Sequence, residues 1–140
     1  MGGETDLKDN SENKQKFLPA WVWTIVFVQV FLVLFFSVGT ALNPGDFIPG
    51  VTEINYVVQL YLTRNVTAVL GIVIALFFRS HQALFAILVV RVLTDLSDTI
   101  SVYALNVEVI KESVPMVVAL LVIPALVALS YLWRRMRAAS

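Results

Sequence analysis

Four long apolar runs, separated by short polar stretches, set the pattern of the chain. They are Pro19–Ala41, Ile54–Phe78, Ala83–Val107 and Val114–Trp133. Each run holds at least 20 residues, which is enough for a helix to cross a hydrocarbon core about 30 Å thick. Because the polar stretches between the runs are short, consecutive helices are expected to run antiparallel. The pattern therefore predicts an all-α integral membrane protein, a four-helix antiparallel bundle over residues 19–133.

The two ends of the chain are polar and lie outside this predicted bundle. Residues 1–18 mix charges of both signs and contain few large apolar side chains, so they bury too little surface to fold alone. We expect them to form a disordered or interfacial cytoplasmic tail. Residues 134–140 include three arginines and are predicted to form a basic cytoplasmic tail. With 59% hydrophobic residues overall, the chain leaves no room for a soluble domain.

Basic residues gather on one side of the predicted spans. Three lysines precede the first run, Arg79 lies between the second and third, and three arginines follow the fourth. The other two loops contain only Lys111. Loops rich in lysine and arginine stay in the cytoplasm, so the sequence predicts a multi-pass protein with cytoplasmic N- and C-termini. We expect it in a bacterial inner membrane, with the lipid bilayer as its first partner.

The composition argues against several classes of chemistry. The chain has no cysteine and a single histidine, so we expect no metal site, disulfide or thiol chemistry. That histidine, His81, lies in a polar turn and is expected to be solvated. The net charge is zero, with no basic patch for nucleic acid and no phosphate-binding glycine loop. No motif in the sequence indicates a particular cofactor.

Four ionisable groups lie inside the predicted spans. Arg64 falls in the second run, and Arg91, Asp95 and Asp98 fall in the third. Translocon scales assign each such group a cost of about 2.5–3.5 kcal/mol at a helix centre. These groups therefore need partners or water inside the protein.

Helix geometry predicts how these groups pair. Arg91, Asp95 and Asp98 are spaced four and three apart, which puts them on one face. The short turn near residue 80 places Arg64 opposite Asp95, both about 22 Å from the turn and in the outer half of the membrane. An Arg64–Asp95 pair is the sharpest prediction. Asp98 is then free to accept hydrogen bonds from Arg64, Tyr61 or water. We expect Asp98 to be the carboxylate that titrates, because Asp95 has closer arginines.

Other polar or bent positions fall at the same predicted depth. Gln29 in the first run, Asn65 beside Arg64, and the kink expected at Pro124 all belong to this layer. Such convergence favours a pocket or a water-filled vestibule. The alternative is a neutral polar network that only locks two helices together. In the first outer loop, Phe47 and Ile48 are expected either to cap the helices or to act as a lid.

The charged positions also carry a resemblance to a known family. Four short spans, Arg64 with the downstream Gly71, and the RVLTDLSD stretch from Arg91 to Asp98 resemble the DoxX-like superfamily of small four-helix membrane proteins. The resemblance covers residues 19–133. Some members are similar to subunits of quinone-linked oxidoreductases, which implies an accessory role in a membrane complex. No catalytic residue carries over.

Three functional hypotheses follow. The first is a charge-lined intramembrane pocket that binds or passes a small polar or amphiphilic ligand. Its candidate residues are Gln29, Tyr61, Arg64, Asn65, Arg91, Asp95 and Asp98. The alternative is an accessory subunit of a quinone-linked membrane oxidoreductase, with the cluster used for assembly with a partner protein. An enzyme using Asp98 as a general base has least support, because no nucleophile–base spacing is present; whether the protein is an enzyme stays open.

Overall fold

The computed structural model describes residues 17–48, 50–106 and 108–139, and these residues form helices joined by short turns. The predicted tail over residues 1–16 lies outside the described residues. The long helices are α2 (Ala20–Leu42), α4 (Tyr56–Phe77) and α5 (His81–Ala104), followed by a continuous helical stretch made of α7 (Val114–Val117), the π-helix η1 (Val118–Val122) and α8 (Ile123–Ala138). Two single-turn helices, α3 (Pro44–Phe47) and α6 (Glu108–Lys111), lie in the connections.

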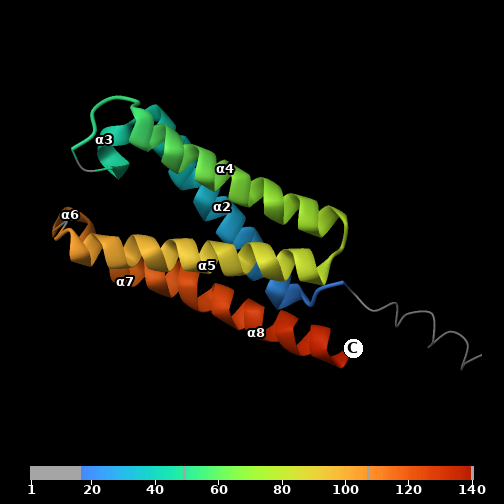
Figure 1. Cartoon of the computed structure of the whole chain (residues 1–140). Coiled ribbons are helices and arrows are strands. Elements are labelled where there is room, and N and C mark those ends of the chain that lie inside the picture. The colour runs from blue at the N-terminus through green and yellow to red at the C-terminus, as the bar shows by residue number, and fades with distance from the viewer. Residues whose placement is uncertain (1–16, 49, 107, 140) are drawn as a thin grey trace, which may run out of the picture.

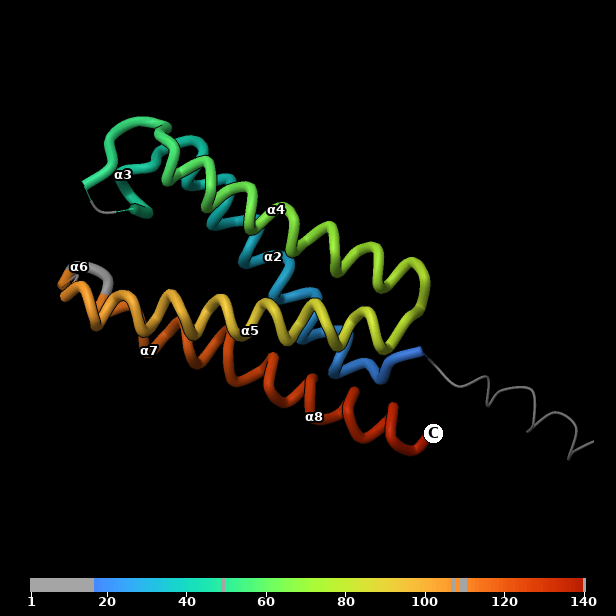
Figure 2. The backbone as a smooth tube through the Cα atoms, in the orientation of Figure 1, coloured from blue at the N-terminus to red at the C-terminus, as the bar shows by residue number. Residues whose placement is uncertain are grey.

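Each long helix packs against its neighbours in the chain. Contacts join α2 to α4, α4 to α5, α5 to α8, and α8 back to α2. Figure 1 shows α4 and α5 close together at their shared turn and farther apart toward α3 and α6. The tube view shows the described start of the chain, the α4–α5 turn and the C-terminus at the same end of the molecule (Figure 2).

Three segments are long and apolar enough to cross a membrane: Ala20–Leu42, Tyr56–Phe77 and Val114–Ala138. They indicate a membrane protein and a lipid bilayer environment. Helix α5 is not among them, because Arg91, Asp95 and Asp98 interrupt its apolar sequence. A polypeptide of this kind exposes apolar side chains to lipid, and exposed Phe27 and Phe31 on α2 are examples.

The buried side chains divide the interior into two layers. The apolar core lies toward the end with the termini and is built from every long helix, with Val22, Ile72, Leu88 and Ala128 among its members. The buried polar side chains lie in the middle of the helices or toward the opposite end: Gln29, Ser37, Thr40, Asn65, Arg91 and Asp95. The protein therefore has an apolar half and a polar half.

The α4–α5 turn is fixed by backbone hydrogen bonds. The N–H of Ser80 donates to the carbonyl of Ala75, and the N–H of Arg79 donates to that of Leu76, which is the Schellman pattern at a helix end. Arg79 takes the left-handed conformation that this pattern requires (φ 49°). The Ser80 hydroxyl then accepts from the N–H of Ala83 and caps α5. This tight reversal sets the depth of α4 relative to α5.

At both ends the packed part of the chain extends beyond the predicted bundle over residues 19–133. The last two positions of the predicted tail pack on the helices rather than being disordered, because Leu18 is buried and Phe17 contacts the His81 ring at 4.5 Å between centroids. His81 is half-buried rather than solvated, and its Nε2 lies 2.7 Å from the Phe17 carbonyl oxygen. At the other end α8 continues to Ala138, so most of the predicted basic tail is helical.

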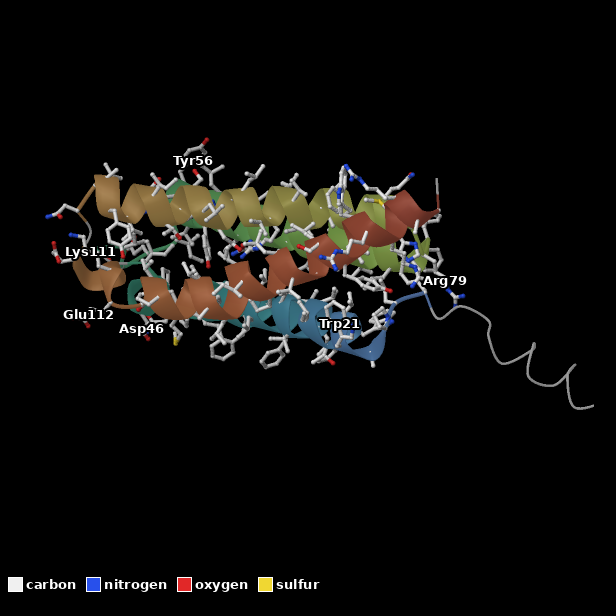
Figure 3. The ribbon with its side chains drawn as sticks, turned by 90° about the horizontal axis from the view of Figure 1, so that it is seen from below. Trp21, Asp46, Tyr56, Arg79, Lys111 and Glu112 are labelled. Carbon is white, nitrogen blue, oxygen red and sulfur yellow. The ribbon has the colours of Figure 1, made fainter. Side chains whose placement is uncertain are left out.

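Aromatic side chains lie at the same end of the molecule as the α4–α5 turn. Trp21 packs edge-on against Tyr131 at 5.2 Å, and Phe85 lies 5.7 Å from Trp133. Figure 3 shows Trp21 and Arg79 toward one end, and Asp46, Tyr56 and Lys111 toward the other. This arrangement agrees with an aromatic belt at a headgroup level.

The loop between α2 and α4 packs on the end of α2. The Phe47 ring lies edge-to-face with Phe36, at 5.9 Å between centroids. The same ring occupies the space that a Cβ at Gly39 would need. Phe47 therefore covers the end of α2, as the capping interpretation expects.

Gly71 allows α4 and α5 to approach closely. A Cβ placed on Gly71 would lie 2.7 Å from Cδ1 of Ile87. We therefore expect Gly71→Val to lower the free energy of unfolding by about 1–3 kcal/mol, the usual cost of overpacking. The measurement is SDS-induced unfolding in detergent micelles, followed by circular dichroism.

Two further variants make this prediction specific. Ile87→Ala in the Gly71→Val background should recover part of the loss, because it removes the atoms that the new side chain meets. Ala86→Val adds a similar volume at an exposed position on α5 and should change stability little. Equal losses at positions 71 and 86 would contradict the close approach.

Candidate functional site

A buried ion pair and an amide form the inner part of the polar half. The Arg91 Nη2 lies 3.0 Å from the Asp95 Oδ1, one helical turn along α5. The Arg91 Nη1 donates to the Asn65 Oδ1 of α4, also at 3.0 Å. The Arg91 and Asp95 side chains are only 9% and 8% exposed, and Asn65 is fully buried. This group therefore ties α5 to α4 across their interface.

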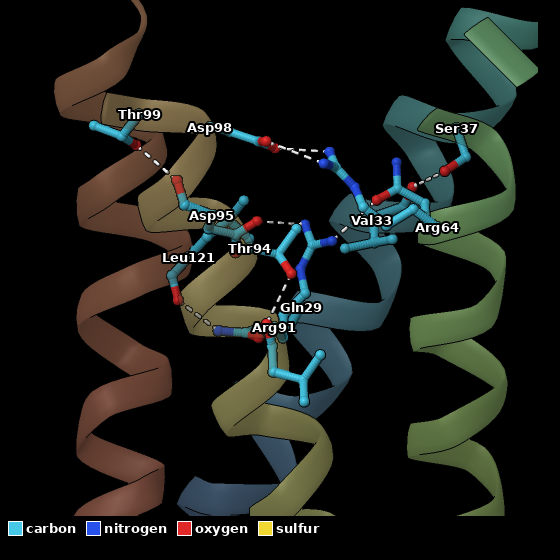
Figure 4. A network of polar contacts seen from close by, with 12 residues as sticks. Gln29, Val33, Ser37, Arg64, Arg91, Thr94, Asp95, Asp98, Thr99 and Leu121 are labelled. Carbon is cyan, nitrogen blue, oxygen red and sulfur yellow. Dashed lines mark hydrogen bonds and ion pairs between the residues drawn. The ribbon is translucent and has the colours of Figure 1, made fainter. Parts of the chain in front are cut away.

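A second ion pair lies nearer the ends of the two helices. Arg64 of α4 donates from Nη1 and Nη2 to both carboxylate oxygens of Asp98, at 3.0 and 2.7 Å. Figure 4 shows Arg64 reaching across from α4 to Asp98 on α5. Tyr61 lies beneath the guanidinium, with its ring centroid 5.5 Å from Cζ. Such two-pronged pairing fixes both the distance and the orientation of the groups.

Exposure distinguishes the two ion pairs. The Arg64 and Asp98 side chains are 39% and 49% exposed, whereas those of Arg91 and Asp95 are about nine-tenths buried. Helix positions explain the difference, because Asp95 turns toward the interior and Asp98 lies at its margin, where α4 and α5 diverge. The outer pair can be reached from outside the protein, and the inner pair cannot.

The predicted Arg64–Asp95 pair is wrong. Depth matching placed Arg64 and the two aspartates at the right level, but it did not determine which aspartate faces α4 at the margin. Arg91 takes the buried Asp95, so the carboxylate left for Arg64 is Asp98. The reason given for favouring Asp98, that Asp95 has the closer arginines, is wrong, because Arg64 holds both carboxylate oxygens of Asp98.

Gln29 lies in the same polar half but binds a different helix. It is 2% exposed, and its Nε2 donates to the Leu121 carbonyl at 2.7 Å. Leu121 belongs to the π-helix η1, which ends just before Pro124. Proline removes a backbone donor, and π-turns and inserted side chains are both features found at helix kinks. A π-helical segment bound by Gln29 therefore lies directly before Pro124, the position at which the sequence predicts a kink.

The arginines leave two hydrogen-bond donors unmet. Among the buried side-chain nitrogens and oxygens of the described residues, Arg64 Nε and Arg91 Nε have no partner. A buried N–H without an acceptor costs about 1–3 kcal/mol. Each arginine of the cluster therefore has one buried N–H group without an acceptor.

The structure brings most of the predicted site residues together and separates one. Tyr61, Arg64, Asn65, Arg91, Asp95 and Asp98 form one group on α4 and α5. Gln29 instead engages the Leu121 carbonyl, a contact that the sequence did not predict, because backbone acceptors carry no residue signature. Thr94, which bonds the Val90 carbonyl on its own helix, lies within the network drawn in Figure 4.

Comparisons with known proteins complete the description of the site. The described residues contain no group of three or more His, Cys, Asp or Glu side chains that could hold a metal ion. No family model matches the sequence, and searches of curated proteins and of solved structures found no significant match.

Proposed function

We propose that this protein is a four-span membrane protein that binds or passes a small polar or amphiphilic ligand at a site on α4 and α5. In this proposal α5 is the fourth span, both termini are cytoplasmic and the site lies in the outer half of an inner membrane. The packing of α5 between α4 and α8 supports this placement, as does the position of Trp21 and Arg79 toward one end of the molecule (Figure 3).

The half-exposed Arg64–Asp98 pair is the observation that carries the proposal. Arg64 lies eight residues into α4, about 12 Å from the helix end. An ion pair at that depth, 39% and 49% exposed, is poorly solvated by hydrocarbon. Water, a polar ligand or a polar partner must therefore cover it.

The two functional interpretations of the cluster apply to different parts of it. The buried Arg91–Asp95–Asn65 group has the geometry of a structural lock between α4 and α5. The outer pair contributes less to stability, because exposed ion pairs are worth only about 0–1 kcal/mol in water. We assign the structural role to the inner group and ligand contact to Arg64, Asp98 and Tyr61.

Thiol accessibility tests this proposal directly. The chain has no cysteine, so an introduced thiol is the only one present. Two single-cysteine variants are compared, Thr94→Cys and Leu93→Cys. Both positions lie about 15 Å from the end of α5, and Thr94 lies one turn before Asp98. We expect the thiol at position 94 to react with a water-soluble methanethiosulfonate in membranes, because only that side borders the ion pair. The thiol at position 93 should be protected by lipid, although Leu93 is 61% exposed.

The opposite result would count against the proposal. If both thiols are inert, or both react equally, α5 has no water-accessible polar face at that depth. The alternative proposal is an accessory subunit of a quinone-linked oxidoreductase, which the DoxX-like resemblance suggests. Inert thiols, together with a stable partner protein retained in mild detergent, would favour that alternative.

A further inference from the structure

We propose that the ligand of this site carries an anionic oxygen group, a carboxylate or phosphate, on an apolar chain. The inference rests on the proposed function and narrows its ligand class. In it, the anionic head takes the place of Asp98 on Arg64. The apolar chain lies among the exposed side chains of α4 and the bilayer.

The balance of donors and acceptors selects an anion. Both Asp98 oxygens accept from Arg64, and the Asn65 oxygen and Asp95 Oδ1 accept from Arg91. The two Nε–H groups still have no acceptor. A cationic ligand would bring further donors to the site, whereas an anionic head brings an acceptor for Arg64 Nε. The Nε of Arg91 belongs to the buried inner pair, which the ligand does not reach.

The geometry of Arg64 suits such an exchange. It already holds one carboxylate with two parallel hydrogen bonds, the arrangement in which guanidinium binds carboxylate and phosphate ligands. Arg64 is the more exposed of the two arginines. Once Asp98 moves away, rotation of the Arg64 side chain can bring Nε as well as Nη2 to the incoming head. The inner Arg91 stays paired and keeps the helices together.

The depth of Arg64 in the proposed membrane limits the kind of ligand that can reach it. A head group that reaches about 12 Å below the helix end must be attached to a part that is stable in hydrocarbon. Exposed Val57 and Leu60 lie on α4 within two turns of Arg64, and Tyr61 packs beside the guanidinium. Together these features fit an amphiphile with a single acidic head rather than a fully hydrated ion.

The test is protection of the Thr94→Cys thiol in phosphatidylcholine nanodiscs. The probes are dodecanoate, dodecyl phosphate and dodecyltrimethylammonium, with a neutral methanethiosulfonate so that membrane surface charge does not alter the rate. At about ten times its dissociation constant a ligand occupies ~90% of sites, so it should slow the reaction about tenfold. We expect one or both anions, and not the cation, to slow the reaction of the thiol. Comparing the protection given by dodecanoate with that given by dodecyl phosphate distinguishes a carboxylate head from a phosphate head.

Two variants identify the residue responsible. In the Thr94→Cys background, Arg64→Gln should abolish protection while the thiol still reacts. Arg79→Gln, which removes an arginine at the opposite end of α4, should leave protection unchanged. Protection by the cation alone, or by none of the probes, would overturn the anionic class while leaving a reactive site intact. An inert thiol at position 94 would overturn both proposals.

Discussion

Replacing Arg91 with methionine is expected to lower the free energy of unfolding by about 3–5 kcal/mol, the range found when one partner of a buried ion pair is removed. The loss arises because Asp95 stays 7% exposed with no cation beside it. Asn65 also loses the donor that Arg91 supplies. The measurement is SDS- or heat-induced unfolding in micelles, with helix content as the signal.

A second substitution distinguishes lost charge pairing from lost packing. In the Arg91→Met background, Asp95→Leu removes the uncompensated carboxylate and should restore much of the stability, since apolar replacements of buried ion pairs are often neutral or stabilising. Arg64→Met, at the half-exposed pair, should cost clearly less than Arg91→Met. Equal losses at positions 64 and 91 would contradict the division into an inner lock and an outer, accessible pair.

Charge reversal at Arg64 is expected to have the second-largest effect. Arg64→Asp places two carboxylates where a two-pronged ion pair now stands, and like charges in such a contact cost several kcal/mol. Asp98→Arg should be comparably damaging. The double variant Arg64→Asp with Asp98→Arg should regain most of the stability of the natural chain, measured by the same unfolding assay.

The choice of partner provides the control for this prediction. Arg64→Asp combined with Asp95→Arg should not recover stability, because it places a second arginine beside Arg91 and leaves Asp98 facing an aspartate. Rescue through position 95 rather than 98 would show that Arg64 pairs with the inner aspartate in the membrane. The two double variants carry the same charges, so net charge cannot account for a difference.

Much of the fold could be predicted from the apolar pattern alone. The runs located the long helices to within a few residues, because continuous apolar sequence and helix length in a bilayer are tightly linked. Depth matching about the turn near residue 80 was accurate to about one helical turn, because Arg64 lies opposite Asp98 rather than the predicted Asp95. Depth depends only on chain length and rise per residue.

The pairing within the site could not be predicted in the same way. Which aspartate faces Arg64 depends on how α5 is rotated and on how far α4 diverges from it, and both are set by packing against α2 and α8. The Gln29 contact also could not be predicted from the sequence, because its acceptor is a backbone carbonyl of the π-helix η1. Sequence spacing identifies which residues share a face, but not which face points inward.

The polar half also explains why α5 differs in composition from the other long helices. Its charged side chains would be costly against lipid, but three of the four arginine and aspartate side chains on α4 and α5 have partners on the neighbouring helix. The fourth, Asp95, is paired along its own helix. A helix of this composition is consistent with crossing a membrane when its neighbours neutralise it.

In the proposed topology, α5 crosses the membrane and so carries the Arg64–Asp98 pair into it. Single cysteines at Ser80, in the α4–α5 turn, and at Ser113, just before α7, test it in intact cells with a membrane-impermeant maleimide. We predict that the thiol at position 113 is labelled from outside and that the thiol at position 80 is labelled only after lysis. If neither thiol is labelled until the cells are lysed, α5 does not span the membrane and the account is wrong.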